Sequence, residues 1–192
     1  MLAFLPGTTL PMTKEAQEDA FASLAPIFAV SGGGLLLSQV AEMTGLGAST
    51  IQNWVKRGWV SSPVGKRYNE LQVSRILLIN LLRPAMRLED IARLLRYVNG
   101  SVDDRSDDII PEPKLYSLLC AAILELSDGE RITHESIVTL IESRLEGYEG
   151  PVPDAADRLK TALSIMLMNV TAAMLMQQAE SIFKQAVKTE EH

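Results

Sequence analysis

Residues 37–58 read LSQVAEMTGLGASTIQNWVKRG, and their spacing of small and apolar side chains predicts two short helices joined by a tight turn. Ala41 is small enough for two helices to cross beside it, and Gly45 permits the positive φ that a tight turn requires. The space between the helices would be filled by Leu46, Ile51 and Trp54. This spacing is typical of a helix-turn-helix motif.

The second helix of this motif presents a polar face. The side chains expected to point outward are Ser49, Thr50, Gln52, Asn53, Lys56 and Arg57. A helix of about nine residues is roughly 13 Å long, which suits a DNA major groove about 12 Å wide. We expect Asn53 to contact a base, because an amide can hydrogen bond twice to adenine, and Lys56 and Arg57 to contact phosphates.

Some of these residues have a structural alternative. Ser49 and Gln52 match an S-x-x-Q capping box, so both could serve only the start of the helix. Trp54 and Trp59 are expected in the core rather than as stacking platforms for bases, because Trp54 falls on the apolar repeat.

A basic turn follows the motif. The segment WVSSPVGKRYN places Lys66, Arg67 and Tyr68 in a short Pro/Gly turn, which is typical of a wing that lies on the DNA backbone. Asn69 and Gln72 form a second capping signature and open a helix, LQVSRILLINLLR, that ends near Pro84. A further helix, RLEDIARLLRYV, would point Leu88, Ile91, Leu94 and Leu95 inward.

Residues 35–98 resemble a MerR-type winged helix-turn-helix. The resemblance is carried by Ser49-Thr50-Ile51, Trp54, Gly58, Pro63, Arg67-Tyr68 and the two helices that follow. As a whole, the chain is similar to domain-of-unknown-function family 1836, an uncharacterised bacterial family with such a domain. The wing is shorter than in MerR regulators, and a helical region of about 80 residues follows in place of a direct dimer helix, so the DNA distortion that MerR regulators cause is not expected here.

The charge is distributed unevenly. The chain has 18 Lys and Arg against 24 Asp and Glu, a net charge of −6, which excludes a protein that coats nucleic acid with its whole surface. Residues 49–100 carry nine basic and three acidic side chains, a net +6, whereas residues 1–48 carry −3 and residues 101–192 carry −9. The positive charge therefore lies on the segment that the motif selects, although a solvated basic face would give the same count.

Outside this segment the chain is also helical in pattern. We expect a helical arm in residues 1–34, with Ala16, Ala20, Leu24 and Ile27 at helical spacing, and the DNA-binding domain in 35–100. An acidic linker with nothing to bury would occupy 101–113, before a helical dimerisation and sensing region in 114–192. That region would contain helices near 115–126 and 133–145 and a long helix from Asp154 to Lys188.

The long helix carries two apolar rows. The first, which we expect to form the dimer interface, consists of Leu159, Leu163, Met166, Val170, Ala173 and Gln177. The second consists of Ile165, Met168, Ala172, Leu175, Ala179 and Ile182. One row could pack on the chain itself and the other on a partner, which predicts a homodimer. Four Met side chains in this helix would also suit a pocket for a small apolar effector, although plain core packing is the alternative.

Other classes of protein find no support. The sequence contains only two His and one Cys and has no Gly-rich phosphate loop. It therefore gives no pattern that indicates an enzyme, a metal site or a cofactor. Cys120 is the single cysteine and cannot form an internal disulfide, which favours a cytoplasmic location. Its side chain is expected to be buried. Residues 161–179 have no charge but include six polar side chains, so they predict a buried helix rather than a membrane span.

We therefore predict an all-α protein in which a MerR-like winged helix-turn-helix domain is followed by a helical region ending in one long helix. Its expected function is sequence-specific binding of double-stranded DNA and regulation of transcription, with residues 49–57 in the major groove and the wing at 64–68 on the backbone. The alternative is a protein-interaction adaptor that uses the same fold without binding DNA.

Overall fold

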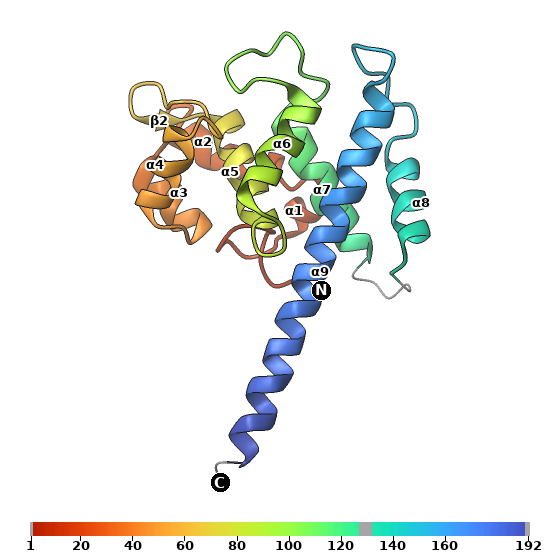
Figure 1. The fold of residues 1–192 in the computed structure, drawn as a ribbon. Helices are drawn as coiled ribbons and strands as arrows, with labels where there is room; N and C mark the ends of the chain where they lie inside the picture. Colours follow the sequence, from red (N-terminus) through yellow and green to blue (C-terminus); the bar gives the residue numbers. More distant parts are fainter. Residues whose placement is uncertain (1, 127–131, 191–192) are drawn as a thin grey trace.

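The computed structural model of the protein describes residues 2–126 and 132–190. Helices form most of its regular structure (Figure 1), as the predicted all-α class requires. In chain order, the elements are α1 (Lys14–Glu18), the 3₁₀ helix η1 (Ala22–Leu24), α2 (Ala25–Val30), β1 (Leu35–Leu36), α3 (Leu37–Thr44), α4 (Ala48–Lys56), β2 (Arg67–Tyr68), α5 (Glu70–Leu82), α6 (Leu88–Asn99), α7 (Glu112–Leu126), α8 (His134–Arg144) and α9 (Ala155–Glu190). The two strands pair antiparallel.

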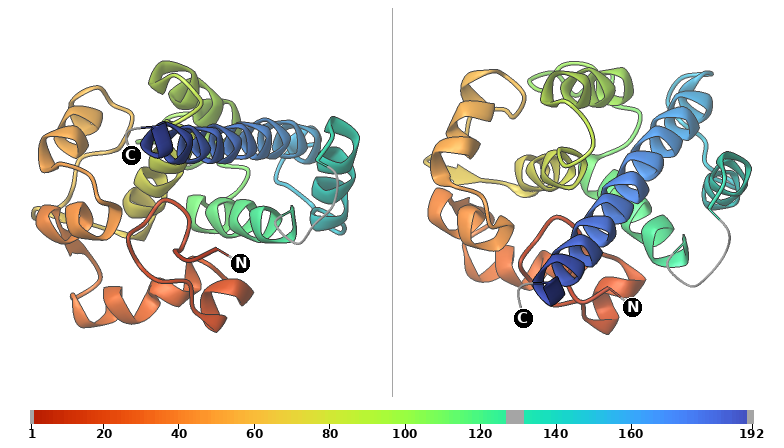
Figure 2. Two further views of the ribbon diagram at one scale, coloured as in Figure 1. Left: turned by 90° about the horizontal axis from the view of Figure 1, so that it is seen from below. Right: turned by 60° about the horizontal axis from the view of Figure 1, so that its bottom comes forward.

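The predicted pair of short helices forms as α3 and α4. Gly45 ends α3 with a left-handed φ of 69°, which allows the chain to turn within a few residues. The three side chains expected between the helices, Leu46, Ile51 and Trp54, are all buried, and Ala41 packs against the same core. Figure 2 places α3 and α4 at one side of the molecule and α8 at the opposite side, with α5, α7 and α9 between them.

The predicted N-terminal helix is interrupted. Thr13 caps α1, but α1 ends at Glu18, and the chain continues through η1 into α2. At the break, the Asp19 carboxylate accepts hydrogen bonds from the N–H groups of Phe21 and Ala22 and from the Ser117 hydroxyl on α7. The apolar spacing correctly predicted the burial of Ala16, Ala20 and Leu24. The helix is interrupted because the short side chain of Asp19 competes for the backbone N–H groups at the break.

Residues 101–113 do not form the predicted linker with nothing to bury. Ile109 and Ile110 enter the core, and Glu112 begins α7 with its side chain 2% exposed. The acidic residues and prolines of this segment indicated a linker, but Ile109, Ile110 and the buried ion pair between Glu112 and Arg75 anchor its end. α5 and α7 then pack along each other, so residues on both sides of this segment share one core.

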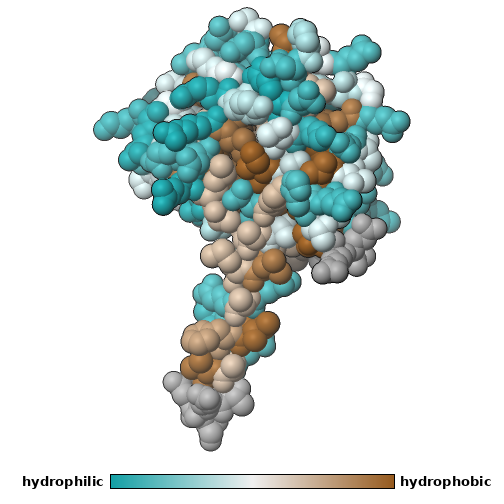
Figure 3. All heavy atoms as spheres, turned by 45° about the vertical axis from the view of Figure 1, so that its right-hand side comes forward, coloured by the Kyte–Doolittle hydropathy of each residue, from teal (hydrophilic) through white to brown (hydrophobic). Residues whose placement is uncertain are grey.

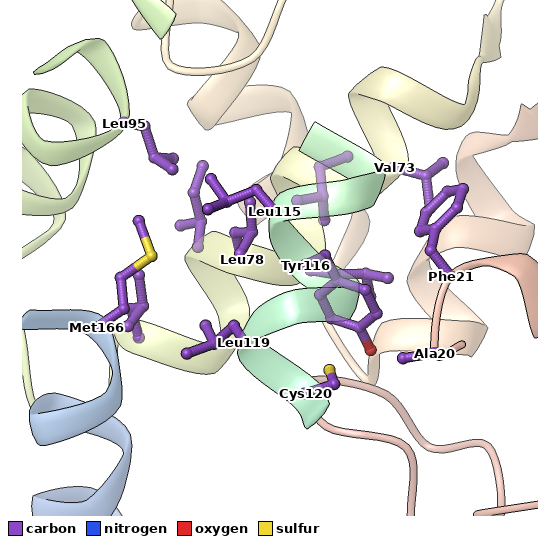
Figure 4. Packing of buried hydrophobic residues seen from close by; sticks show 14 of the residues in the cluster. Ala20, Phe21, Val73, Leu78, Leu95, Leu115, Tyr116, Leu119, Cys120 and Met166 are labelled. Carbon is purple, nitrogen blue, oxygen red and sulfur yellow. The ribbon is translucent and has the colours of Figure 1, made fainter. Parts of the chain in front are cut away.

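The core draws on nearly every part of the fold. Figure 4 shows side chains from the N-terminal segment, α5, α6, α7 and α9 meeting around the middle of α7. Among them, Phe21 lies edge-on to Tyr116, with ring centroids 6.2 Å apart, and the Tyr116 hydroxyl donates to the Pro6 carbonyl at 2.6 Å. Cys120 is fully buried beside them, and burial raises the pKa of its thiol to about 12. As predicted, this cysteine is a small apolar side chain of the core.

The long helix α9 uses its first apolar row within the chain itself. Five of the six predicted dimer-interface residues are buried against the protein's own helices, namely Leu159, Leu163, Met166, Val170 and Ala173. Only Gln177 of that set is exposed. The predicted interface is therefore corrected, because helices α6, α7 and α8 cover the row that was expected to meet a partner. The C-terminal part of α9 extends away from the rest of the molecule (Figure 1).

By length and composition alone, α9 could also cross a membrane. Its span Ala155–Val187 includes an 18-residue window with a mean hydropathy of 1.5, and half of that window is buried inside the protein. Burial of this kind is typical of a core helix in a protein that contains no membrane span.

Candidate nucleic-acid interface

The outward face of α4 presents the predicted polar side chains. Ser49, Gln52, Asn53 and Lys56 are exposed, Thr50 is partly exposed, and Ile51 and Trp54 point into the core. α4 begins at Ala48 after Gly47, so Ser49 lies within the first turn and not at the capping position. The capping-box alternative for Ser49 and Gln52 is therefore wrong, and both side chains are available on the surface.

The second predicted capping box does form, and it positions the turn after α4. The Asn69 side chain accepts from the Gln72 N–H at 3.0 Å, and the Gln72 side chain accepts from the Asn69 N–H at 2.9 Å. The Gln72 amide also donates to the Ser62 carbonyl at 2.8 Å. Because Gln72 is buried at the start of α5, it fixes the segment between α4 and β2 to the body of the protein.

The predicted wing is a tight turn. Gly65 and Lys66 both have positive φ, 58° and 63°, and the Arg67 N–H donates to the Val64 carbonyl at 3.0 Å. Two central residues with positive φ are the mark of a type I′ turn, which joins antiparallel segments. The turn leaves Lys66 exposed at its tip beside Val64, which is 82% exposed.

Of the three predicted wing contacts, Tyr68 is corrected and Arg67, although exposed, already has partners within the protein. Tyr68 is 3% exposed, pairs with Leu35 in the small sheet, and has a pKa raised by burial, so its ring supports the fold. The Arg67 guanidinium donates through Nη1 to the carbonyls of Ser31 at 3.0 Å and Gly34 at 2.9 Å. Strand alternation explains both results, because pairing with β1 turns Tyr68 inward and brings Arg67 over the preceding turn.

At the C-terminal end of α4, Arg57 contacts other side chains of the protein while remaining partly exposed to solvent. Its guanidinium lies 3.4 Å from the Glu89 carboxylate at the start of α6 and 5.1 Å from the centre of the Trp59 ring. Both charged side chains remain more than half exposed. Trp59 is partly buried and packs against the core, as predicted. Arg57 could therefore reach a phosphate only by weakening its contact with Glu89.

Arg75 is a residue whose role the charge count missed. Its side chain is 5% exposed, and Nη1 donates to the Glu112 carboxylate at 2.8 Å while Nε donates to the Trp59 carbonyl at 2.7 Å. Burial lowers the Arg75 pKa, and the Glu112 charge opposes that shift. Counting Glu112 with residues 49–100 reduces their net charge from +6 to +5. No local pattern identifies Arg75, since its partner lies 37 positions away.

Other kinds of site have little support. Within residues 2–126 and 132–190, no group of three His, Cys, Asp or Glu side chains is arranged to hold a metal ion. A hollow of 340 Å³ lies between α7 and α9, and its apolar walls include Ile123, Leu126, Leu167, Val170 and Met174.

Comparisons with known proteins agree with the family expected from the sequence. Residues 34–119 match the family model described as Domain of unknown function (DUF1836). The chain is 32% identical over 114 residues to the uncharacterized protein YkrK of Bacillus subtilis (strain 168), an alignment that covers 57% of this chain and 46% of YkrK. No solved structure matches. The match includes α3, α4, the turn, α5, α6 and the first half of α7, so these residues are similar to the DUF1836 family.

Proposed function

We propose that this protein binds double-stranded DNA as a sequence-specific transcription regulator. In this proposal α3 and α4 act as a helix-turn-helix, α4 enters the major groove, and the Gly65–Lys66 turn lies near the backbone as a short wing. The observation that carries the proposal is the outward face of α4, where Gln52, Asn53 and Lys56 are exposed while Ile51 and Trp54 anchor the helix. A rigid helix with amide and cationic side chains on one face has the chemistry that reads base edges and phosphates.

The structure changes the roles within this proposal. Lys56 and Lys66 are the cations we assign to phosphates, since both are exposed at opposite ends of the α4 and turn segment. Arg67 is assigned to holding the turn, because its guanidinium already binds two carbonyl groups. Asn53 keeps the predicted role of base reading. Tyr68 no longer belongs to the proposed surface.

The first experiment is selection of bound sequences from random DNA, followed by fluorescence anisotropy over a salt series. A DNA-binding protein of this kind should enrich one sequence, and its affinity should fall steeply with salt as counterions return to the phosphates. The absence of an enriched sequence together with salt-independent weak binding would contradict the proposal.

Two variants separate base reading from phosphate contact. Asn53→Ala should relax preference at one base position at a cost of about 1–3 kcal/mol, because it removes hydrogen bonds to one base. Lys66→Ala should weaken binding to all sequences about equally and reduce the salt dependence. Lys160→Ala is the matched control for charge, because Lys160 pairs with Glu142 on the α8 side of the molecule. Equal losses for Lys66→Ala and Lys160→Ala would mean that only net charge matters.

The alternative function is a protein-interaction adaptor. The observation in its favour is Val64, an apolar side chain 82% exposed at the tip of the turn, which is poorly suited to a phosphate. A protein partner would be indicated if Val64→Ser abolished association while Lys56→Ala and a rise in salt had little effect. As a regulator, the protein would act in the cytoplasm, and the hollow between α7 and α9 is where a small apolar effector would fit.

A further inference from the structure

The protruding part of α9 exposes a continuous apolar face. Its large side chains are highly exposed, with Leu175 at 58%, Met176 at 61%, Ile182 at 66% and Phe183 at 67%. In Figure 3, brown and tan atoms run from the body of the protein along this helix. Single exposed apolar residues are ordinary, but a contiguous face of this kind marks a surface that another molecule covers.

This face continues the second apolar row of α9. The row consists of Ile165, Met168, Ala172, Leu175, Ala179, Ile182 and Ala186, at alternating spacings of three and four residues. Such spacing is the heptad pattern of helices that pair with one another. Ile165 and Met168 are half-buried where the row crosses the body, and the members from Ala172 onward are exposed. The first row faces the chain's own core, so the second row has an open side.

From Met168 onward, large and small side chains alternate along this row. One class of positions holds Ala172, Ala179 and Ala186, and the other holds Met168, Leu175 and Ile182. We propose that a second copy of this chain covers the row, with the two α9 helices antiparallel around a two-fold axis that passes between them at the level of Gln177. Ala172 then lies opposite Ile182 of the second copy, Ala179 opposite Leu175, and Ala186 opposite Met168.

The size pattern specifies this orientation. In the antiparallel pair each alanine meets a large side chain, so the two surfaces interdigitate and fill the contact. In a parallel pair each alanine would face an alanine, which leaves a gap at three levels of the contact. A two-fold axis also makes the surface complementary to itself, as an isologous dimer requires. The paired stretch from Met168 to Ala186 is about 27 Å long.

The charges along α9 are compatible with this pairing. The positions that flank the row carry no charge, being Asn169, Met176 and Phe183 on one side and Thr171, Gln178 and Gln185 on the other. The nearest charged pair, Glu180 and Lys184, is bonded within the helix at 2.6 Å. Among the positions of α9 itself, the pairing therefore brings no like charges together.

A lipid bilayer is a poorer occupant of the same face. The exposed part of α9, from Leu175 to Val187, is about 20 Å long, whereas a bilayer core is about 30 Å thick. It also carries Glu180 and Lys184 within that length. The rest of the helix is packed into the body and is not free to enter a membrane.

Sedimentation equilibrium of the full chain without DNA tests this proposal. A mass of about twice 21.1 kDa is expected at micromolar concentration. Leu175→Glu should shift the protein to the monomer by placing a carboxylate in the contact, while Gln177→Glu is the matched control on the outer side of the same helix. A wild-type monomer at every concentration, or equal dissociation by both variants, would overturn the proposal. Since no DNA is present, the result is independent of the proposed DNA binding.

Cysteine cross-linking tests the orientation. In the antiparallel pair, Ala172→Cys in one copy lies near Ile182→Cys in the other, so mixing the two variants under oxidising conditions should give a disulfide-linked heterodimer. Two copies of Ile182→Cys would be about 15 Å apart along the axis, too far to form a disulfide. Efficient cross-linking of Ile182→Cys with itself would indicate a parallel pair and contradict the proposal. Binding of the monomer to phosphatidylcholine vesicles would contradict it in favour of a lipid surface.

Discussion

Glu112→Leu should be among the most destabilising single substitutions in this protein. The Glu112 carboxylate accepts from Arg75 at 2.8 Å and from Arg105 at 2.8 Å, and its side chain is 2% exposed. Removing it leaves two guanidinium groups without their shared partner. Arg105 is 38% exposed and can return to water, but Arg75 is 5% exposed and cannot.

The size of the loss follows from that difference. Breaking a buried ion pair by removing one partner costs about 3–5 kcal/mol, because it leaves an uncompensated buried charge. A domain of this size is stable by only about 5–15 kcal/mol, so much of the free energy of unfolding would be lost. At a urea dependence of about 2–3 kcal/mol per molar, the unfolding midpoint should fall by roughly 1–2 M.

Urea unfolding followed by circular dichroism at 222 nm measures this loss. The double substitution Arg75→Met with Glu112→Leu should recover most of the stability, since it replaces both charges by apolar groups of similar volume. Asp108→Asn is the milder control, because the pKa of Asp108 is raised by burial and by the Glu112 charge, so the folded protein already disfavours its ionised form. If Glu112→Leu costs less than about 1 kcal/mol, or if the double variant is no better, the buried charge is not what stabilises this contact.

Three further substitutions or measurements have defined outcomes. Burial alone would raise the pKa of Asp19, but hydrogen bonds from Ser117, Ala22 and Phe21 lower it. The ionised Asp19 should therefore stabilise the fold above its ordinary pKa of 3.8, and this stabilisation should be lost as the pH falls through the lower folded value. The stability difference between wild type and Asp19→Asn, measured by urea unfolding, should shrink between pH 6 and pH 2.5, and a constant difference would contradict this. Gly34→Ala should cost about 1–2 kcal/mol in the same assay, because its Cβ would lie 3.0 Å from the Arg67 Cβ and 3.3 Å from the Tyr68 carbonyl oxygen, whereas Gly47→Ala, with 3.8 Å to its neighbours, is the control. The Cys120 thiol should react with a disulfide reagent only as the protein unfolds, since it is buried with a pKa of about 12, and rapid reaction of the folded protein would exclude its burial.

Local patterns predicted the helices of this chain well and the partners of its side chains poorly. Helical spacing and capping residues predicted the ends of α5 to α9 to within about three residues, because each signal lies close in sequence to the helix that it defines. The Asn69 and Gln72 capping box is an example. The burial of Arg75 depends on Glu112, and the tether of Arg67 depends on the turn at Ser31 and Gly34, so neither could be predicted from neighbouring residues.

The two apolar rows of α9 illustrate the same limit. Both have heptad spacing, and the sequence alone does not say which row faces the chain's own core. The difference lies in the size of the side chains: the buried row holds Leu159, Leu163 and Met166, whereas the open row repeats an alanine every seven residues. Large side chains at most positions of the buried row, where Ala173 is the exception, fill the space between several helices, while an alanine repeat suits the close approach of a single straight helix.

The proposed reading surface and the proposed dimer surface are connected through one continuous core. Trp54 anchors α4 in that core, Arg75 joins the carbonyl of Trp59 after α4 to Glu112 at the start of α7, and α7 packs against α9. A two-fold axis between the two α9 helices would therefore fix the distance and rotation between the two α4 helices, without a flexible linker to absorb a change. DNA turns once in about 10–10.5 base pairs, so inserting about five base pairs between two half-sites would place one of them on the opposite face of the duplex. A protein built in this way should tolerate base changes between its half-sites much better than a change in their spacing.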